Sequence, residues 1–113
     1  MRKALALAVV ALTACATQTD VRRDGVRSQY PLVFAPESAA RCISIQFSGL
    51  WPFFKATHRL RQDGVVELIG YEFERAILVI EIARAPQGSS GTVWLSPTKV
   101  GEMRSIEGLM NGC

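Results

Sequence analysis

The chain carries few side chains that could do covalent or metal chemistry, namely three cysteines and one histidine among 113 residues. Cys42 and Cys113 stand far apart, and neither belongs to a Cys-x-x-Cys pair of the kind that supports thiol redox chemistry. Two separated cysteines and one histidine also lack the spacing of a tetrahedral zinc site. We therefore expect neither a metal nor a cofactor.

His58 is the only histidine, and a histidine acts as a general base only with a positioned partner. A nucleophilic triad would also need Ser89 or Ser90 and an acid such as Asp63, but no spacing supports that grouping. The segment 88–91 is one residue short of the Gly-x-Ser-x-Gly elbow. We expect no catalytic residue and no enzymatic activity, with His58 partly buried in a strand.

The carboxylates of the middle of the chain are spread over adjacent predicted strands, close in sequence to several arginines. We expect them to form cross-strand ion pairs on a solvated sheet face, each contributing about 0.2–1 kcal/mol. The acids are Glu67, Glu72, Glu74 and Glu81, and the bases are Arg59, Arg61, Arg75 and Arg84.

The beginning of the chain has the pattern of an export signal. Arg2 and Lys3 are followed by an apolar run from Ala4 to Leu12 and then by small residues. A basic start, a short apolar stretch and small residues before a processing point are typical of secretory signal peptides. The run is shorter than the roughly 20 residues that cross a bilayer as a helix. We expect residues 1–14 to be a signal peptide.

Leu12-Thr13-Ala14-Cys15 resembles the lipobox of bacterial lipoproteins, which is a leucine, a small or polar residue, alanine or glycine, and a cysteine. The resemblance implies that Cys15 receives a diacylglyceryl group on its sulfur, becomes the first mature residue and is acylated on its amino group, so that it can be labelled with palmitate. An anchor of two or more acyl chains holds a protein firmly on a membrane. The alternative is an ordinary signal peptide cut elsewhere, for example after Ala16.

The residue after the anchor bears on location. In the enterobacterial pattern an aspartate there retains a lipoprotein on the inner membrane, whereas this chain has Ala16. The resemblance therefore implies an outer-membrane lipoprotein facing the periplasm. Loss of Arg2 and Lys3 with the leader leaves eleven basic residues against ten acidic ones, a net charge of +1. So balanced a chain gives no argument for nucleic-acid binding.

With Cys15 assigned to lipid, an even pair of cysteines remains. An even remainder in an exported protein predicts a disulfide, here between Cys42 and Cys113. In the chain-entropy model such a long closed loop stabilises a domain by about 4 kcal/mol.

Composition changes along the mature chain. Residues 15–29 begin with the lipidated N-terminus that the lipobox resemblance implies at Cys15, and their mostly polar composition predicts a flexible tether. Hydrophobicity rises at Tyr30, so we expect the domain to span residues 30–113.

Within 30–113 the patterns predict an α+β fold closed by one disulfide, with a short N-terminal helix, an antiparallel sheet of four to five strands and a C-terminal helix. Proline at the first helical position and two alanines favour a helix over 36–42. Alternation of Ile43, Ile45 and Phe47 with polar residues predicts a strand.

Further strands are predicted over 53–61, 65–69, 73–85 and 92–95, with 76–83 apolar on both faces and therefore central. Asp63-Gly64 predicts a type I′ hairpin turn. Ser96-Pro97 can begin the last helix, which would turn Met103, Ile106 and Met110 to one side.

One segment is a candidate interaction patch, formed by Leu50, Trp51, Phe53 and Phe54 around Pro52. If exposed, it would contact a partner protein. If it folds inward, it fills one end of the core, and we favour this placement because so small a domain needs its aromatic residues.

These patterns predict a non-enzymatic lipoprotein of the cell envelope, held on its membrane through Cys15 and acting in a structural role or through a protein partner. Beyond its first residues, the chain resembles small proteobacterial envelope lipoproteins with a cysteine-bridged domain. The alternative is a module that binds a small ligand or an envelope fragment in a pocket beside the sheet, with polar groups such as His58 and Arg59.

Overall fold

The computed structural model describes residues 17–113, and the predicted signal peptide and Cys15 lie outside these residues. The described part has the predicted α+β fold, with one five-stranded antiparallel sheet and a C-terminal helix. In chain order the elements are α2 (Gln18–Asp24), β1 (Val26–Leu32), α3 (Pro36–Leu50), β2 (Phe54–Leu60), β3 (Val66–Glu72), β4 (Arg75–Arg84), β5 (Ser89–Leu95), η1 (Pro97–Glu102) and α4 (Met103–Asn111).

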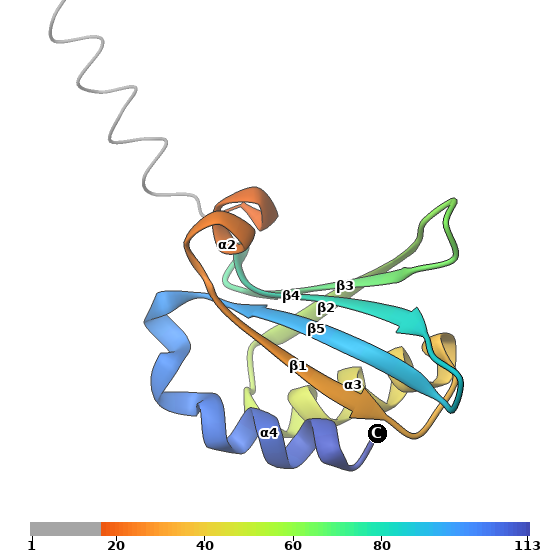
Figure 1. Cartoon of the computed structure of the whole chain (residues 1–113). Coiled ribbons are helices and arrows are strands. Elements are labelled where there is room, and N and C mark those ends of the chain that lie inside the picture. Colours follow the sequence, from red (N-terminus) through yellow and green to blue (C-terminus); the bar gives the residue numbers. More distant parts are fainter. Residues whose placement is uncertain (1–16) are drawn as a thin grey trace, which may run out of the picture.

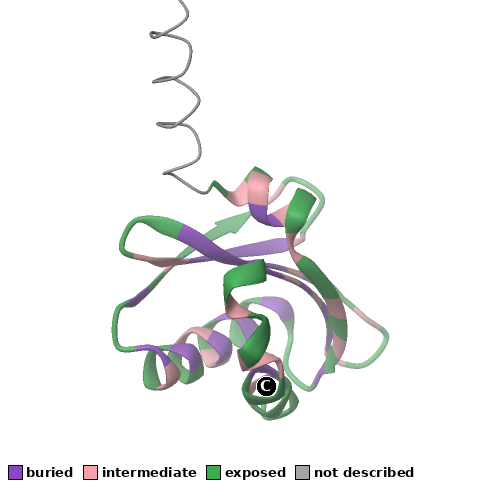
Figure 2. Cartoon of the chain, turned by 90° about the vertical axis from the view of Figure 1, so that its left-hand side faces the viewer, coloured by how far each residue is buried: buried purple, intermediate pink, exposed green. Residues whose placement is uncertain are grey.

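The sheet has the strand order β1-β5-β4-β3-β2, and α3 and α4 cover one of its faces (Figure 1). The short helix α2 lies on the opposite face, against β4 and β5. Strand β4 is central and buried over most of its length, as its two-sided apolar sequence predicts (Figure 2). Among residues 17–113, no helix is long and apolar enough to cross a membrane.

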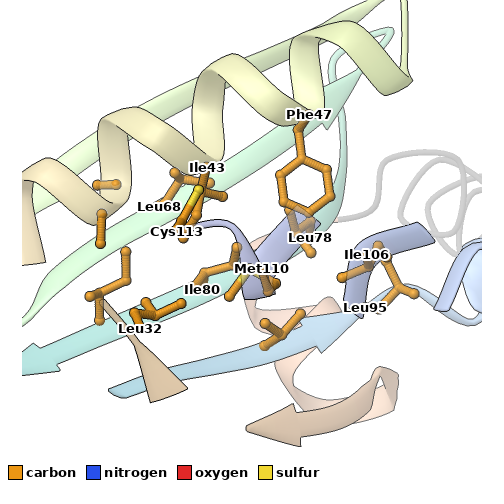
Figure 3. Packing of buried hydrophobic residues seen from close by; sticks show 14 of the residues in the cluster. Leu32, Ile43, Phe47, Leu68, Leu78, Ile80, Leu95, Ile106, Met110 and Cys113 are labelled. Atoms are coloured by element: carbon orange, nitrogen blue, oxygen red, sulfur yellow. The ribbon is translucent and has the colours of Figure 1, made fainter. Parts of the chain in front are cut away.

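The main core lies between the sheet and the two long helices (Figure 3). Ile43 and Phe47 of α3 and Ile106 and Met110 of α4 point to the sheet and are at most 1 % exposed. The predicted inward side of the last helix is therefore confirmed, with Met103 partly buried at its margin. The strands supply the facing apolar side chains, which include Leu68, Leu78, Ile80, Val93 and Leu95.

The predicted disulfide is present between Cys42 and Cys113, whose Cα atoms are 5.8 Å apart. Cys113 is completely buried, and its carbonyl oxygen accepts hydrogen bonds from the amides of Val33 (3.0 Å) and Phe34 (3.1 Å). The last residue of the chain is thus bonded both to α3 and to the segment after β1.

The strand predicted from Ile43 onward is wrong, because α3 continues to Leu50. Ile45, which the alternating pattern placed on a buried face, is 73 % exposed, whereas Ala39, Ile43 and Phe47 are buried. These buried positions recur at helical spacing, so the alternation was a coincidence of two isoleucines and a phenylalanine.

The flexible tether predicted for residues 15–29 is also wrong over the part that the structure describes. Helix α2 begins with a capping box in which Thr17 and Asp20 bond to each other's backbone amides, and the Thr17 amide lowers the pKa of Asp20. Val21 is 3 % exposed, and β1 pairs with β5 along its whole length. The folded unit therefore begins before the predicted start at residue 30.

The turn at Asp63-Gly64 is not of the predicted type I′. At Asp63-Gly64 only the glycine has a positive φ (84°), and the bonds Gly64 N–H to Arg61 O and Arg61 N–H to Val65 O define a longer loop. A type I turn followed by a left-handed glycine has this pattern. The two-residue turn with both φ values positive lies instead between β3 and β4, at Phe73 (51°) and Glu74 (64°).

Candidate functional site

The predicted interaction patch is divided between the core and the surface. Trp51 and Phe54 are 5 % and 8 % exposed and pack with Phe47 at ring-centroid distances of 5.3 and 5.6 Å. Leu50 is partly buried against the same core. The inward placement therefore holds for Trp51 and Phe54 and in part for Leu50. Only Phe53, at 60 % exposure, presents its side chain to solvent.

Phe53 meets a residue that the sequence reasoning missed. Its ring centroid lies 4.7 Å from that of Phe73, which is 73 % exposed at the tip of the β3–β4 turn. The two rings border a groove of about 770 Å³ beside the edge of the sheet, which we call the aromatic groove. Its lining residues are Pro52, Phe53, Phe54, Lys55, Thr57, Tyr71, Phe73 and Glu74.

The backbone positions the two rings at a cost. A phenylalanine and a glutamate at positive φ occupy the left-handed region that favours glycine and asparagine, and each such residue costs on the order of 1–3 kcal/mol. Gly70 helps on the other side, because a Cβ there would lie 2.3 Å from the Phe54 ring. The absence of a side chain at Gly70 lets Phe54 turn inward, which leaves its neighbour Phe53 outside.

The lining of the groove is suited to binding. Its walls are aromatic, with Lys55 and Glu74 as the charged groups and Thr57 and Tyr71 as hydroxyl groups. This lining fits a ligand with an apolar or aromatic part that packs against the rings. A polar or acidic group next to that part could contact the polar side chains.

His58 and its candidate partners are not brought together. The His58 side chain is exposed rather than partly buried, and its Nε2 lies 2.7 Å from Ser44 Oγ. Asp63 instead accepts a hydrogen bond from Arg61, and Ser89 donates to the carbonyl oxygen of Phe34. No triad forms from these residues.

The pocket that the alternative hypothesis needed at His58 and Arg59 is small. A hollow of about 270 Å³ lies there between α3 and β2. Ligand pockets commonly measure about 300–1,000 Å³, so the aromatic groove is the better candidate for a small ligand as well.

A second constellation lies on the sheet face that carries α2, and we call it the ion cluster. Glu67, expected on a solvated face, is 2 % exposed, and its two carboxylate oxygens lie 2.5 Å from Arg22 Nη2 and 3.2 Å from Arg59 Nη2. Glu81, which pairs with Glu67 across the strands, contacts Arg61 and lies 3.9 Å from Arg22. Each carboxylate is thus neutralised by arginines, so the cluster attaches α2 and offers no free acid.

Within residues 17–113, no group of three or more histidine, cysteine or acidic side chains is placed to hold a metal ion. Comparison with protein-family models, curated proteins and solved structures finds no match. Among the sites that the structure describes, the aromatic groove is the leading candidate.

Proposed function

We propose that this protein is a non-enzymatic lipoprotein of the cell envelope that is anchored through Cys15, on the outer membrane facing the periplasm, and binds a protein partner in the aromatic groove. The observation that carries the binding role is the contact between Phe53 and Phe73, two rings that remain exposed on a strained turn and its neighbouring loop. Strained backbone that holds apolar side chains in solvent points to a binding function.

The disulfide supports export. Cys42 and Cys113 are the two cysteines that remain once Cys15 is assigned to lipid, and they are bonded to each other. Disulfides persist in the periplasm and are rare in the cytosol.

The position of α2 supports a location close to the membrane. This helix begins at Gln18, three residues after Cys15 in the sequence. Three residues span at most about 10 Å when extended. An anchor at Cys15 would therefore hold the domain at the membrane surface, in place of the long tether expected from composition.

Binding of a small ligand is the second candidate, and the size of the aromatic groove favours it. The groove falls within the usual range for ligand pockets, and Lys55, Thr57 and Tyr71 provide polar groups that could orient a ligand. The protein partner remains the first candidate because Phe53 and Phe73 project from the surface, as aromatic anchors of protein interfaces do.

The anchor is tested by the full-length Cys15→Ala variant in cells grown with radioactive palmitate. We expect label on the parent chain and on Cys42→Ser, and background label on Cys15→Ala. Label that persists on Cys15→Ala would refute the anchor.

The groove is tested by crosslinking in intact cells with Phe53→Ser and Phe73→Ser. We expect both variants to lose the partners that the parent chain captures. Ile45→Ser is the matched control, because Ile45 is also 73 % exposed but lies on α3. If folded Phe53→Ser and Phe73→Ser proteins crosslink to the same partners as the parent chain, the proposal is refuted. Loss of a bound small molecule with unchanged protein partners would favour the second candidate.

A further inference from the structure

Strand β2 forms one edge of the sheet, directly beside the aromatic groove. It pairs with β3 on one side, and no strand in residues 17–113 pairs with its other side. Apart from Phe54 and Ala56 its residues are exposed. An edge of this kind is a template on which an extended chain can add as a further strand.

The register shows which backbone groups point outward. The Arg61 amide donates to the Val65 carbonyl oxygen across 2.9 Å, so the backbone N–H of Arg61 points from the β2 side toward the β3 side of the hairpin. Antiparallel ladders alternate, which places Thr57 and Arg59 in bonded pairs with β3. The N–H and C=O groups of Ala56, His58 and Leu60 therefore point away from β3, toward an incoming strand.

The side chains of this edge carry one sign of charge on the face that holds the groove. Lys55, Thr57 and Arg59 share that face, and Lys55 makes no ion pair with any residue from 17 to 113. Arg59 also contacts the buried Glu67 across 3.2 Å, but its side chain is 66 % exposed and can meet a second carboxylate. In an antiparallel pair of two copies centred on Thr57, Lys55 would lie opposite Arg59. Like charges directly opposite each other destabilise a sheet, so this edge disfavours self-association and favours an acidic strand.

We propose that β2 is the docking edge for an extended acidic segment of the partner protein, which adds antiparallel as a sixth strand and places an apolar residue in the aromatic groove. This inference rests on the proposed binding function. On the outer side of β2, Lys55, Thr57 and Arg59 occupy the non-hydrogen-bonded positions, where paired side chains approach most closely. The segment therefore carries acids four residues apart, opposite Arg59 and Lys55, and an aromatic residue two positions further on, beside Phe53.

A membrane surface fits the same aromatic residues less well. Glu74 adjoins Phe73 in the turn, and an anionic bilayer would repel its carboxylate, whereas Glu72 is ion-paired with Lys99 across 2.9 Å. A peptide that places its acids on β2 and only an aromatic residue beside the turn avoids this repulsion.

The test uses the full chain extracted from membranes in mild detergent and the peptide Glu-Val-Thr-Val-Glu-Val-Phe with blocked ends. Amide hydrogen exchange is followed by nuclear magnetic resonance. We expect the amides of His58 and Leu60 to exchange at least tenfold more slowly with the peptide, while Thr57 and Arg59, already bonded to β3, change less. The peptide with lysine in place of glutamate should bind at least tenfold more weakly. Equal binding of the two peptides, or binding of neither, overturns the proposal, as does binding without slower exchange at these amides.

Two variants separate strand addition from other modes. Lys55→Glu should weaken binding of the acidic peptide at least tenfold and strengthen that of the lysine peptide. Leu60→Pro removes an outward N–H without removing a bond to β3, whereas Leu60→Val keeps the N–H and serves as its control. If both Lys55→Glu and Leu60→Pro fold and bind the acidic peptide with the affinity of the parent chain, the β2 edge is excluded as the docking site.

Failure of this inference can be told apart from failure of the proposed function. If Phe53→Ser loses the partner in cells while Lys55→Glu and Leu60→Pro retain it, binding in the groove is supported and strand addition on β2 is refuted. If vesicles of phosphatidylglycerol bind the chain with the Cys15→Ala substitution in a Phe73-dependent manner and the peptide does not, the surface contacts lipid and the inference is overturned.

Discussion

Arg22 Nη2 donates a hydrogen bond to Glu67 Oε2 across 2.5 Å and so joins α2 to β3 over 45 positions of sequence. The relationship matters because Glu67 pairs with Glu81 on the neighbouring strand, where two carboxylates would repel each other. The guanidinium of Arg22 lies near both carboxylates and 5.4 Å from the centre of the Trp94 ring. Helix α2 therefore supplies the positive charge that offsets the repulsion between these two carboxylates of the sheet.

Replacing Arg22 should destabilise the whole domain. In Arg22→Ala the buried Glu67 keeps only Arg59 and again faces Glu81, so we expect a loss of about 2–3 kcal/mol in unfolding free energy. Urea denaturation followed by tryptophan fluorescence measures it. Arg23→Ala is the control on the same helix, since the side chain of Arg23 is 66 % exposed and solvent screens its ion pairs with Asp20 and Asp24. Equal effects of the two substitutions would contradict this role of Arg22.

Reducing the disulfide should lower stability strongly without changing the fold. The bond joins residues 71 positions apart, and a loop of that size contributes about 4 kcal/mol in the chain-entropy model. We expect a large fall in the urea midpoint on adding reductant to the parent chain. A double variant with Cys42→Ser and Cys113→Ser should be insensitive to reductant. The same response in both proteins would show that the effect does not come from this bond.

The hairpin of β2 and β3 should contribute to acid sensitivity. The hydrogen bond from Arg61, followed by that from the Val65 amide, lowers the pKa of Asp63 below its ordinary value of 3.8. A carboxyl with a lowered folded-state pKa stabilises the protein above its unfolded pKa, and this contribution is lost as the pH falls through the folded value. We therefore expect Asp63→Asn to be less stable than the parent at pH 7, with the difference shrinking below about pH 4. Urea midpoints measured over this pH range test it, and a difference that does not change with pH would refute the assignment.

We expect the β3–β4 turn to lower the stability of the protein while it serves binding. Replacing Phe73 by asparagine and Glu74 by glycine supplies the pair that a turn with two positive φ values prefers, so we expect a gain of about 1–2 kcal/mol in unfolding free energy. The same double variant loses the ring that contacts Phe53 and should lose partner capture. Glu74→Gly alone should be more stable while keeping the ring. A loss of stability in Glu74→Gly would contradict the strain assigned to this turn.

The aromatic groove could be predicted only in part. Phe53 belongs to an apolar cluster that the sequence makes conspicuous, but its exposure depends on Phe54 and Trp51 having filled the core. Phe73 begins an apolar run whose pattern predicts a strand, and neither residue 73 nor residue 74 is of a type that signals a turn with positive φ. Their contact arises from the pairing of β2 with β3, which sets Phe54 opposite Glu72.

Features whose causes are local or arithmetic could be predicted from the sequence. An even pair of cysteines predicted the disulfide, two-sided apolarity predicted that β4 is central, and Ser96-Pro97 predicted where the last helical segment begins. Tertiary structure alone decided the extent of α3, the docking of α2 and the exposure of Phe53 and Phe73. Burial of one face selects between helix and strand where short apolar patterns fit both, and the charge of Arg22 acquires a meaning only when folding places Glu67 and Glu81 beside it.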